Sequence, residues 1–524
     1  MLNHIPISEQ LPLIHDIHAD DQLLLNCPDA DWYSKLKFFP WEDYREIGAQ
    51  YYDALHHFNQ PSDPEPVIDD TDETKKQAAQ RHLSDRPTIN KTQPVLYQPE
   101  FKSVPVPTVS PFKIAPGILP HRDAGKKPKC FFAMFKCFIG ATLMGLPPEP
   151  EKVHFLLTSN LSFARVCGFI PKGAEQESLS KYVPSLRKLE QFDQIMTDYG
   201  LWNRCKQQEI HTNIENGVIK EENIVVGDTT HYYAYSGFET VTYTDENGKE
   251  KKKSQSKVTK NCRCEDQENC PHPWDLADEG AGTIVKGKGS KKIIWGHKAS
   301  IVGLPLQGIP LDARCVADAA THDSQTFYPH VVSLFEDHPE IQPWFDIALY
   351  DSACDIDKLK EQFRMDLGIQ LKTSLNPRRR YTITANLPKG MDRLTPYANL
   401  VCRGGQIMDY QGVRYDMEKF IYRSPLDENN EPVCNTCPNK LECCPFSEKG
   451  RVATIDFDLL PHIDPNDPPM AKRFKAIMTR RPSVERMIKR LKCDLSDDRL
   501  SKRGNASFQA YLDKTMIAFH ILLR

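Results

Sequence analysis

The sequence predicts an α/β protein in which a mixed sheet is flanked by helices. Two observations lead to this fold class. Short apolar runs rich in β-branched residues alternate with helix-period segments between residues 221 and 376, and this alternation is typical of a mixed α/β sheet. The hydrophobic period is helical before residue 220 and again after residue 470. A chain of 524 residues is too long for one ordinary domain, so we expect two to four.

The order of the predicted elements supports this fold class. Apolar runs typical of strands lie at 223–228, 231–235, 292–298, 313–317, 345–350 and 368–372. Helical periods lie between them at 324–335 and 358–364, and a closing apolar helix is expected at 507–523. The lysine-rich stretch 249–260 is expected to be a solvated loop, and Pro482 is expected to open a helix.

Composition divides the chain into six segments. Residues 1–120 carry 18 acids against 10 bases, and residues 61–120 hold 11 of the 40 prolines, which favour extended chain. The predicted segments are an acidic N-terminal arm (1–60), a proline-rich linker (61–127), a helical DNA-binding or dimerisation domain (128–220), the first part of the sheet domain (221–376), a β-rich, cysteine-containing insertion (377–469) and the C-terminal helices of the sheet domain (470–524).

The composition also excludes some classes of protein. With 40% hydrophobic and 26% charged residues, the chain is neither wholly disordered nor a fibrous repeat. The apolar stretch 130–146 is interrupted by Lys136 and is shorter than the roughly 20 residues of a membrane span, so we expect a buried helix and no membrane partner. Sixteen cysteines without a secretory signal indicate reduced thiols in a cytoplasmic protein. Residues 471–503 carry 12 bases against 4 acids and indicate an anion-binding surface.

Three carboxylates are candidates for a catalytic site. Asp228 and Asp351 each follow an apolar strand, and loops at strand ends are where α/β sheets place their chemistry. Glu485 lies on the basic helix, where 3.6 residues per turn put Arg481 and Lys492 on its own face. Taken singly, such residues are usually turn formers or surface ion pairs. Their joint appearance, in this order, indicates a metal and phosphate site.

With these residues the sequence resembles the DDE transposases of bacterial insertion sequences, whose catalytic core has an RNase H-like fold. The family's C-terminal signature is Tyr-x2-Arg-x3-Glu-x6-Lys, and Arg481, Glu485 and Lys492 fall in its register. The likeness covers roughly 128–524 and includes three further segments, Asp228-Thr229-Thr230, Gly296-His297-Lys298 and Asp351-Ser352-Ala353-Cys354-Asp355. Met478 and Cys354 stand where the family has tyrosine.

The resemblance implies an enzyme that cleaves DNA strands and transfers them to a target. Asp228, Asp351 and Glu485 would be the catalytic residues and would hold Mg²⁺ or Mn²⁺, because oxygen ligands select hard cations. The partner would be double-stranded DNA, both the element ends and the target, with a homodimer assembled on it. The predicted contacts to DNA phosphates are Arg481, Lys492, Arg486, Lys489 and Arg490.

Three alternatives stay open. One is a metal-dependent nuclease that cuts without joining. Another is a catalytically inactive DNA-binding protein derived from a transposase. Met478 and Cys354, which stand where the family has tyrosine, are the reason for this alternative. The third is a phosphohydrolase with Asp228 as its nucleophile, a hypothesis that leaves the basic helix unexplained.

Two groups of cysteines are candidates for structural zinc sites. Cys434, Cys437, Cys443 and Cys444 put four thiols into eleven residues, a spacing that suits tetrahedral Zn²⁺, although ordinary loop thiols are the rival interpretation. A second group contains Cys262, Cys264, Cys270 and His272.

Overall fold

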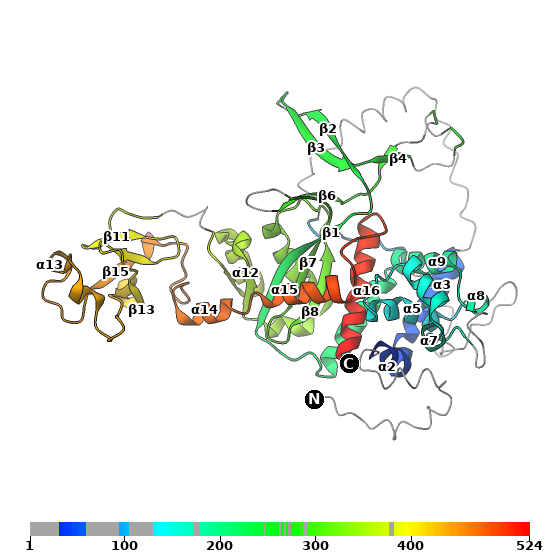
Figure 1. Cartoon of the computed structure of the whole chain (residues 1–524), viewed down its shortest axis with the longest axis horizontal. Coiled ribbons are helices and arrows are strands. Elements are labelled where there is room, and N and C mark those ends of the chain that lie inside the picture. The colour runs from blue at the N-terminus through cyan, green and yellow to red at the C-terminus, as the bar shows by residue number, and fades with distance from the viewer. Residues whose placement is uncertain are drawn as a thin grey trace, which may run out of the picture.

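The computed structural model divides the protein into three parts. It describes residues 31–58, 94–103, 129–170, 179–245, 247–260, 264–266, 269–270, 272, 274–286, 292–376 and 382–524. Figure 1 shows a helical unit at one end, a central sheet domain and a β-rich insertion at the other end. Within the described ranges, no helix combines the length and apolar character that crossing a membrane requires.

The central sheet has the strand order β10-β9-β1-β7-β6, and β8 pairs with β7 beside β6. Its strands are β1 (Ile224–Tyr233), β6 (Gly282–Lys286), β7 (Lys292–Leu304), β8 (Ile309–Cys315), β9 (Ile347–Tyr350) and β10 (Gln370–Thr373). β1, β7 and β8 are antiparallel neighbours, whereas β9 and β10 run parallel to β1 on its other side. This is the strand order of an RNase H-like sheet, and the predicted fold class is confirmed.

The central strands are apolar because helices cover both of their faces. Ile224 and Val226 share a buried cluster with Val484 of α15 (Ser483–Lys489), whereas Val225, which points to the other face, packs in the cluster of α11 (Phe327–Asp337). Gly227 allows α11 to approach closely, since a Cβ there would lie 2.4 Å from the ring of Phe327.

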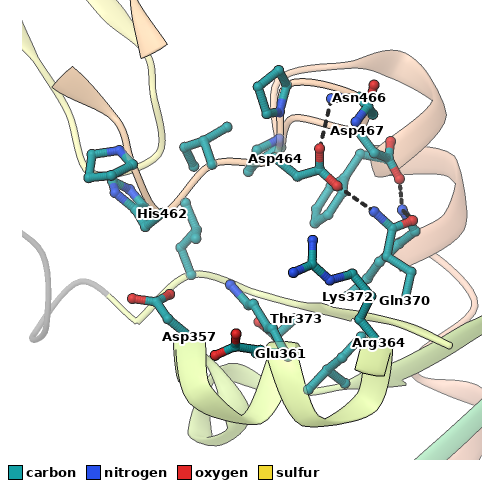
Figure 2. A pocket seen from close by; sticks show the side chains of 18 residues that line it. Asp357, Glu361, Arg364, Gln370, Lys372, Thr373, His462, Asp464, Asn466 and Asp467 are labelled. Carbon is teal, nitrogen blue, oxygen red and sulfur yellow. Dashed lines mark hydrogen bonds and ion pairs between the residues drawn. The ribbon is translucent and has the colours of Figure 1, made fainter. Parts of the chain in front are cut away.

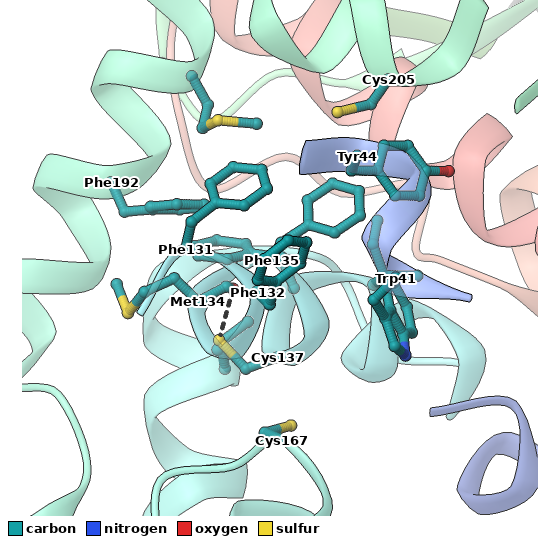
Figure 3. Close-up of a cluster of buried hydrophobic side chains, with 14 of the residues drawn as sticks. Trp41, Tyr44, Phe131, Phe132, Met134, Phe135, Cys137, Cys167, Phe192 and Cys205 are labelled. Atoms are coloured by element: carbon teal, nitrogen blue, oxygen red, sulfur yellow. Dashed lines mark hydrogen bonds between the residues drawn. The ribbon is translucent and has the colours of Figure 1, made fainter. Parts of the chain in front are cut away.

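The helical unit is built around an aromatic core. Its helices are α2 (Asp31–Phe38), η3 (Trp41–Tyr44), α3 (Arg45–Phe58), α5 (Phe131–Leu143), α6 (Pro150–Ser159), α7 (Leu161–Val166), α8 (Leu179–Tyr182), α9 (Leu186–Asp198) and α10 (Leu201–Glu215). Figure 3 shows Tyr44 and Phe135 packed together, with ring centroids 4.8 Å apart. α5 is almost entirely buried, which confirms the buried helix expected at 130–146.

The described part of the predicted acidic arm belongs to this core. Trp41 and Tyr44 are buried against α5, so residues 31–58 do not form a separate arm. The physical reason is the apolar and aromatic side chains of this segment, which outweigh its net negative charge once α5 and α10 offer a surface to cover.

The helical unit is joined to the sheet at several places, among them α16 and residues 94–103. α16 (Asn505–Leu523) packs against α5 and α10 and also against β8, and Figure 1 shows it standing between the two parts. Residues 94–103 of the predicted linker run between the same parts, because Tyr97 N donates to Cys315 O at 2.9 Å and Lys102 N donates to Asp198 O at 2.8 Å. The rest of the linker lies outside the described residues.

A pair of small hairpins leaves the sheet after β1. They consist of β2 (Phe238–Thr244) with β3 (Glu250–Ser256), and β4 (Val258–Lys260) with β5 (Trp274–Leu276). The expectation of a loop at 249–260 is therefore wrong: an exposed hairpin can carry lysines on both faces, and its strands give no alternating apolar pattern. The two strands predicted at 223–228 and 231–235 form the single strand β1.

The β-rich insertion has a hydrophobic core of its own, which includes Phe420, Tyr422 and Ile455. Its strands are β11 (Met391–Leu394), β12 (Leu400–Cys402), β13 (Asp409–Arg414), β14 (Lys419–Arg423) and β15 (Val452–Asp456). Where the chain returns to the sheet, a cavity of about 510 Å³ opens between residues 461–474 and the pair formed by β10 and α12 (Asp357–Leu367). Figure 2 shows Asp464 above it and Lys372 and Arg364 below.

Candidate active site

Asp228 lies within β1, on the face that α15 covers. Its Oδ2 atom accepts a hydrogen bond from Arg481 Nη2 at 2.6 Å, and its Oδ1 atom accepts one from the backbone N–H of Thr229 at 2.8 Å. The sequence placed this aspartate at the end of a strand, but β1 continues to Tyr233. The carboxylate therefore projects from a paired strand that is held on both sides.

Asp351 follows β9, the parallel neighbour of β1. The two strands pair in register up to Val226 and Leu349, and each aspartate comes two residues later, so both belong to the same face of neighbouring strands about 5 Å apart. Asp351 Oδ1 also accepts the N–H of Ala353 at 2.8 Å, which fixes the turn η8 (Ser352–Cys354). The parallel register thus brings the two predicted aspartates together.

Glu485 lies in the first turn of α15 and reaches the site through Arg481. Arg481 Nη1 donates to Glu485 Oε1 at 2.7 Å, while the same guanidinium binds Asp228. Arg481 and Glu485, which the sequence places four residues apart, therefore form an ion pair. Glu485 has a 61% exposed side chain, so it forms the solvent side of the site. α15 begins directly after Pro482, as expected.

The electrostatics of Asp228 are those of a carboxylate with too little positive charge around it. Burial raises the pKa of Asp228 to about 6, Arg481 and the Thr229 N–H oppose the rise, and the nearby charges of Asp351 and Asp323 add to it. Arg481 Nε is buried and has no hydrogen-bond partner among the described residues. The excess of negative charge therefore favours a further cation near these carboxylates.

Asp323 is a fourth carboxylate of this site that sequence reasoning missed. It lies in η6 (Asp323–Gln325), and its Oδ1 atom accepts from Thr229 Oγ1 at 2.8 Å and from Lys298 Nζ at 2.9 Å. These contacts lower the pKa of Asp323 despite its burial. A signal was available in Lys298, which belongs to the segment Gly296-His297-Lys298 that carried part of the resemblance.

The predicted phosphate contacts divide into two groups. Arg486, Lys489 and Arg490 are exposed on α15 or just after it. Lys492 differs, because its Nζ donates to the carbonyl of His231 and lies 5.2 Å from the ring of Tyr232. Residues 490–494 form a π-helical turn, in which the spacing of side chains differs from that of the α-helix expected from the sequence.

The donor set fits a hard divalent cation. Asp228, Asp351 and Glu485 all offer oxygen, and like charges that gather in one place favour a cation between them. Among the described residues, the group of three metal-ligating atoms that lie within 4.8 Å of one another is a different one, Cys264, Cys270 and His272. Arg481 thus joins Asp228 to Glu485, Asp351 is close enough to raise the pKa of Asp228, and the three carboxylates are spaced more widely than the ligands of a closed metal site.

The cysteines predicted at 434–444 lie in η11 (Val433–Thr436), in α13 (Lys440–Cys443) and beside them. Burial raises the pKa of Cys443, and the neighbouring thiols Cys402 and Cys437 raise it further. Cys402 was not in the predicted set, because it comes from β12 and only the fold brings it close. Cys262, of the second predicted group, lies outside the described residues.

Comparisons with known proteins find likeness in structure alone. No family model and no curated protein matches the sequence. A solved piggyBac transposase in a synaptic complex with hairpin DNA matches with a TM-score of 0.31 and 10% identity, over 77% of this chain and 68% of that chain. The Mos1 transposase in a paired-end complex with the left transposon end matches with a TM-score of 0.15 and 10% identity, over 45% of this chain and 76% of that chain. Both similar structures are transposases, but scores this low carry no functional conclusion.

Proposed function

We propose that this protein is a DDE transposase that cuts DNA at the ends of an insertion sequence and joins the cut ends to target DNA. One observation carries the proposal: in an RNase H-like sheet, Asp228 of β1 and Asp351, which directly follows the parallel neighbour β9, each come two residues after the last paired residues, and Arg481 links Asp228 to Glu485. This arrangement supports the predicted triad, whose members come from three distant parts of the chain.

Asp228, Asp351 and Glu485 are the residues that would hold Mg²⁺ or Mn²⁺, with Asp228 between the other two. Bound there, the metal supplies Lewis-acid stabilisation of the attacking and leaving oxygens of a phosphodiester. The attacking group is water in the cleavage step and the freed 3′-hydroxyl in the joining step. Asp228 must be ionised to act as a ligand, and the rise of its pKa to about 6 leaves it largely ionised at neutral pH.

Arg481 changes partners in this mechanism. Its side chain is 20% exposed, and its guanidinium binds both Asp228 and Glu485. When a DNA backbone enters, Arg481 turns to a phosphate and frees the two carboxylates for the metal. Lys298 keeps Asp323 and Thr229 in place beside Asp228, so that the strand does not shift as the charges rearrange.

Exposed bases on the C-terminal helices provide the DNA surface. Arg486, Lys489 and Arg490 continue the exposed basic row that starts on α14 (Lys472–Met478). Such contacts give affinity without reading sequence. Lys492 has a structural role, because its hydrogen bond to the His231 carbonyl connects the π-helical turn to β1. The protein acts on DNA as a homodimer in this proposal.

The experiment is a strand cleavage and joining assay with Mg²⁺ on DNA that carries the element ends. These ends are sought in the DNA flanking the gene, as imperfect inverted repeats bounded by a short direct duplication. Cleavage and joining by the wild type, both lost in Asp228→Asn, support a transposase. Cleavage without joining identifies the nuclease, and binding without cleavage identifies the inactive DNA-binding protein. Cleavage that survives Glu485→Gln removes Glu485 from the site.

A further inference from the structure

The loop between β4 and β5 brings three metal-ligating side chains to one point. His272 Nδ1 lies 3.5 Å from Cys264 Sγ and 3.6 Å from Cys270 Sγ. The three ligand atoms all lie within 4.8 Å of one another. In a tetrahedral zinc site with ordinary Zn–S and Zn–N bonds, sulfur and nitrogen ligands are about 3.6 Å apart. The observed separations therefore already match those of a zinc-bound set.

A hydrogen bond between thiol and imidazole does not explain this geometry. A neutral imidazole nitrogen that accepts has one lone pair, so it can accept well from one S–H donor and not from two. Here both sulfurs approach the same atom, His272 Nδ1, at nearly equal distance. Convergence of two thiols and one ring nitrogen on a common point is what a shared cation produces.

The base of this loop is tied to the sheet domain. Asp278 N donates to Ser256 Oγ at 3.1 Å, and His297 Nε2 lies 3.0 Å from Asp278 Oδ1. Closer to the cluster, Lys260 Nζ donates to the carbonyl of Cys270 and lies 5.3 Å from the ring of Trp274. This contact fixes the backbone of Cys270 relative to β4.

The described residues of the loop do not pack into a hydrophobic core that could stabilise it. None of the described residues between Val258 and Leu276 belongs to a buried hydrophobic cluster, and Trp274 is 39% exposed. Small segments without a core are commonly held by a disulfide or a metal. Cys264 and Cys270 are thiols and not disulfide partners.

We propose that Cys264, Cys270 and His272 form a zinc site that holds together the loop between β4 and β5. Two thiolates and an imidazole are borderline-soft ligands, which select Zn²⁺ over Mg²⁺. The site lies apart from the carboxylates of Asp228 and Asp351 and does not depend on the proposed function. The role of the site is structural: the bound ion stabilises a loop that has no hydrophobic core.

The zinc content of the full-length protein tests the proposal. Protein from zinc-supplied cells is purified without chelators, and its zinc is measured by mass spectrometry. The double variant Cys264→Ser/Cys270→Ser is expected to hold about one zinc ion per chain less than the wild type. Zinc held elsewhere cancels in this difference. Cys493→Ser, which removes an exposed thiol outside the cluster, keeps the wild-type content. Equal zinc content in the double variant and the wild type overturns the proposal.

A second measurement uses the wild type and does not depend on how a variant folds. Trypsin can cut after Arg263, inside the loop. Removal of zinc by a chelator is expected to speed this cut about tenfold, because opening of the loop becomes easier. Added Zn²⁺ restores the slow rate and added Mg²⁺ does not. A rate of cutting after Arg263 that is unchanged by the chelator overturns the proposal.

Discussion

Two aspartates differ in their electrostatics, the buried Asp193 in the helical unit and the partly buried Asp228 in the sheet domain. Asp193 is held by Lys514 at 2.7 Å and by Lys502 at 2.6 Å, and these cations overcome its burial and lower its pKa to about 2. Asp228 has one cation, Arg481, and burial together with nearby aspartates raises its pKa to about 6.

This difference separates a structural carboxylate from a functional one. The charge of Asp193 is neutralised within the fold, where it joins α9 to α16. The charge of Asp228 is left partly uncompensated, which destabilises the fold and prepares the site to bind a cation. In this protein the two carboxylates differ in how fully nearby cations compensate their charge, and the excess negative charge at Asp228 is what the proposed metal site requires.

The largest expected effect concerns Asp228 and activity. Asp228→Asn removes a metal ligand and is expected to lower the rate of strand cleavage on the order of a thousandfold, because metal stabilisation of the transition state contributes several kcal/mol. The measurement is the cleavage assay with Mg²⁺. Asp416→Asn, in an exposed ion pair with Arg414, is the control and keeps the wild-type rate. Equal rates in both variants would contradict a catalytic Asp228.

The next effect concerns Asp193 and stability. Asp193→Asn leaves Lys514 buried without its charge partner and is expected to lower the free energy of unfolding by about 3–5 kcal/mol. Urea denaturation measures it. Asp198→Asn on the same helix breaks only a partly exposed ion pair with Lys102, and should cost about 0–1 kcal/mol. If Asp193→Asn lowered the free energy of unfolding as little as the control variant does, the structural role assigned to Asp193 would be wrong.

A third effect is the pH dependence of stability. A carboxylate whose pKa is about 6 when folded and about 4 when unfolded destabilises the fold once it is ionised. Asp228→Asn should therefore be more stable than the wild type by up to about 3 kcal/mol above pH 6, and the difference should vanish toward pH 4. Urea denaturation of both proteins from pH 4 to pH 8 measures it.

Asp193 provides the opposite case within the same chain. Its contribution to stability is present above about pH 4 and is lost as the pH falls toward 2, because its folded pKa lies below the unfolded one. A difference between Asp228→Asn and the wild type that stays constant with pH would show that Asp228 is neutralised as fully as Asp193.

The smallest effect concerns the exposed bases. Arg486→Gln and Lys489→Gln should each weaken DNA binding about equally on all sequences and should reduce the slope of log affinity against log salt by about 1. Binding titrations at several salt concentrations measure this slope. Arg414→Gln, an exposed base on the insertion, is the control. An unchanged slope in Arg486→Gln would exclude a phosphate contact by this residue.

Sequence patterns were sufficient for the local parts of the candidate site. The strand before Asp351 and the spacing from Arg481 to Glu485 depend on periods of two and 3.6 residues, which neighbouring side chains determine. Asp323 escaped prediction because its link to Thr229 and Lys298 joins three separate segments. The π-helical turn at Lys492 and its hydrogen bond to the His231 carbonyl also join distant segments and could not be predicted from local spacing.

By itself, the sequence determined the alternation of strands and helices, the buried character of α5 and the identity of the carboxylates and thiols. These depend on side-chain polarity and short-range spacing, which can be read one residue after another. Only the tertiary structure decided that residues 31–58 join the helical core, that the pairing of β1 with β9 brings Asp228 near Asp351, and that Cys264, Cys270 and His272 converge. Each of these needs contacts between distant segments, and their energies depend on burial and charge that arise only once the chain has folded.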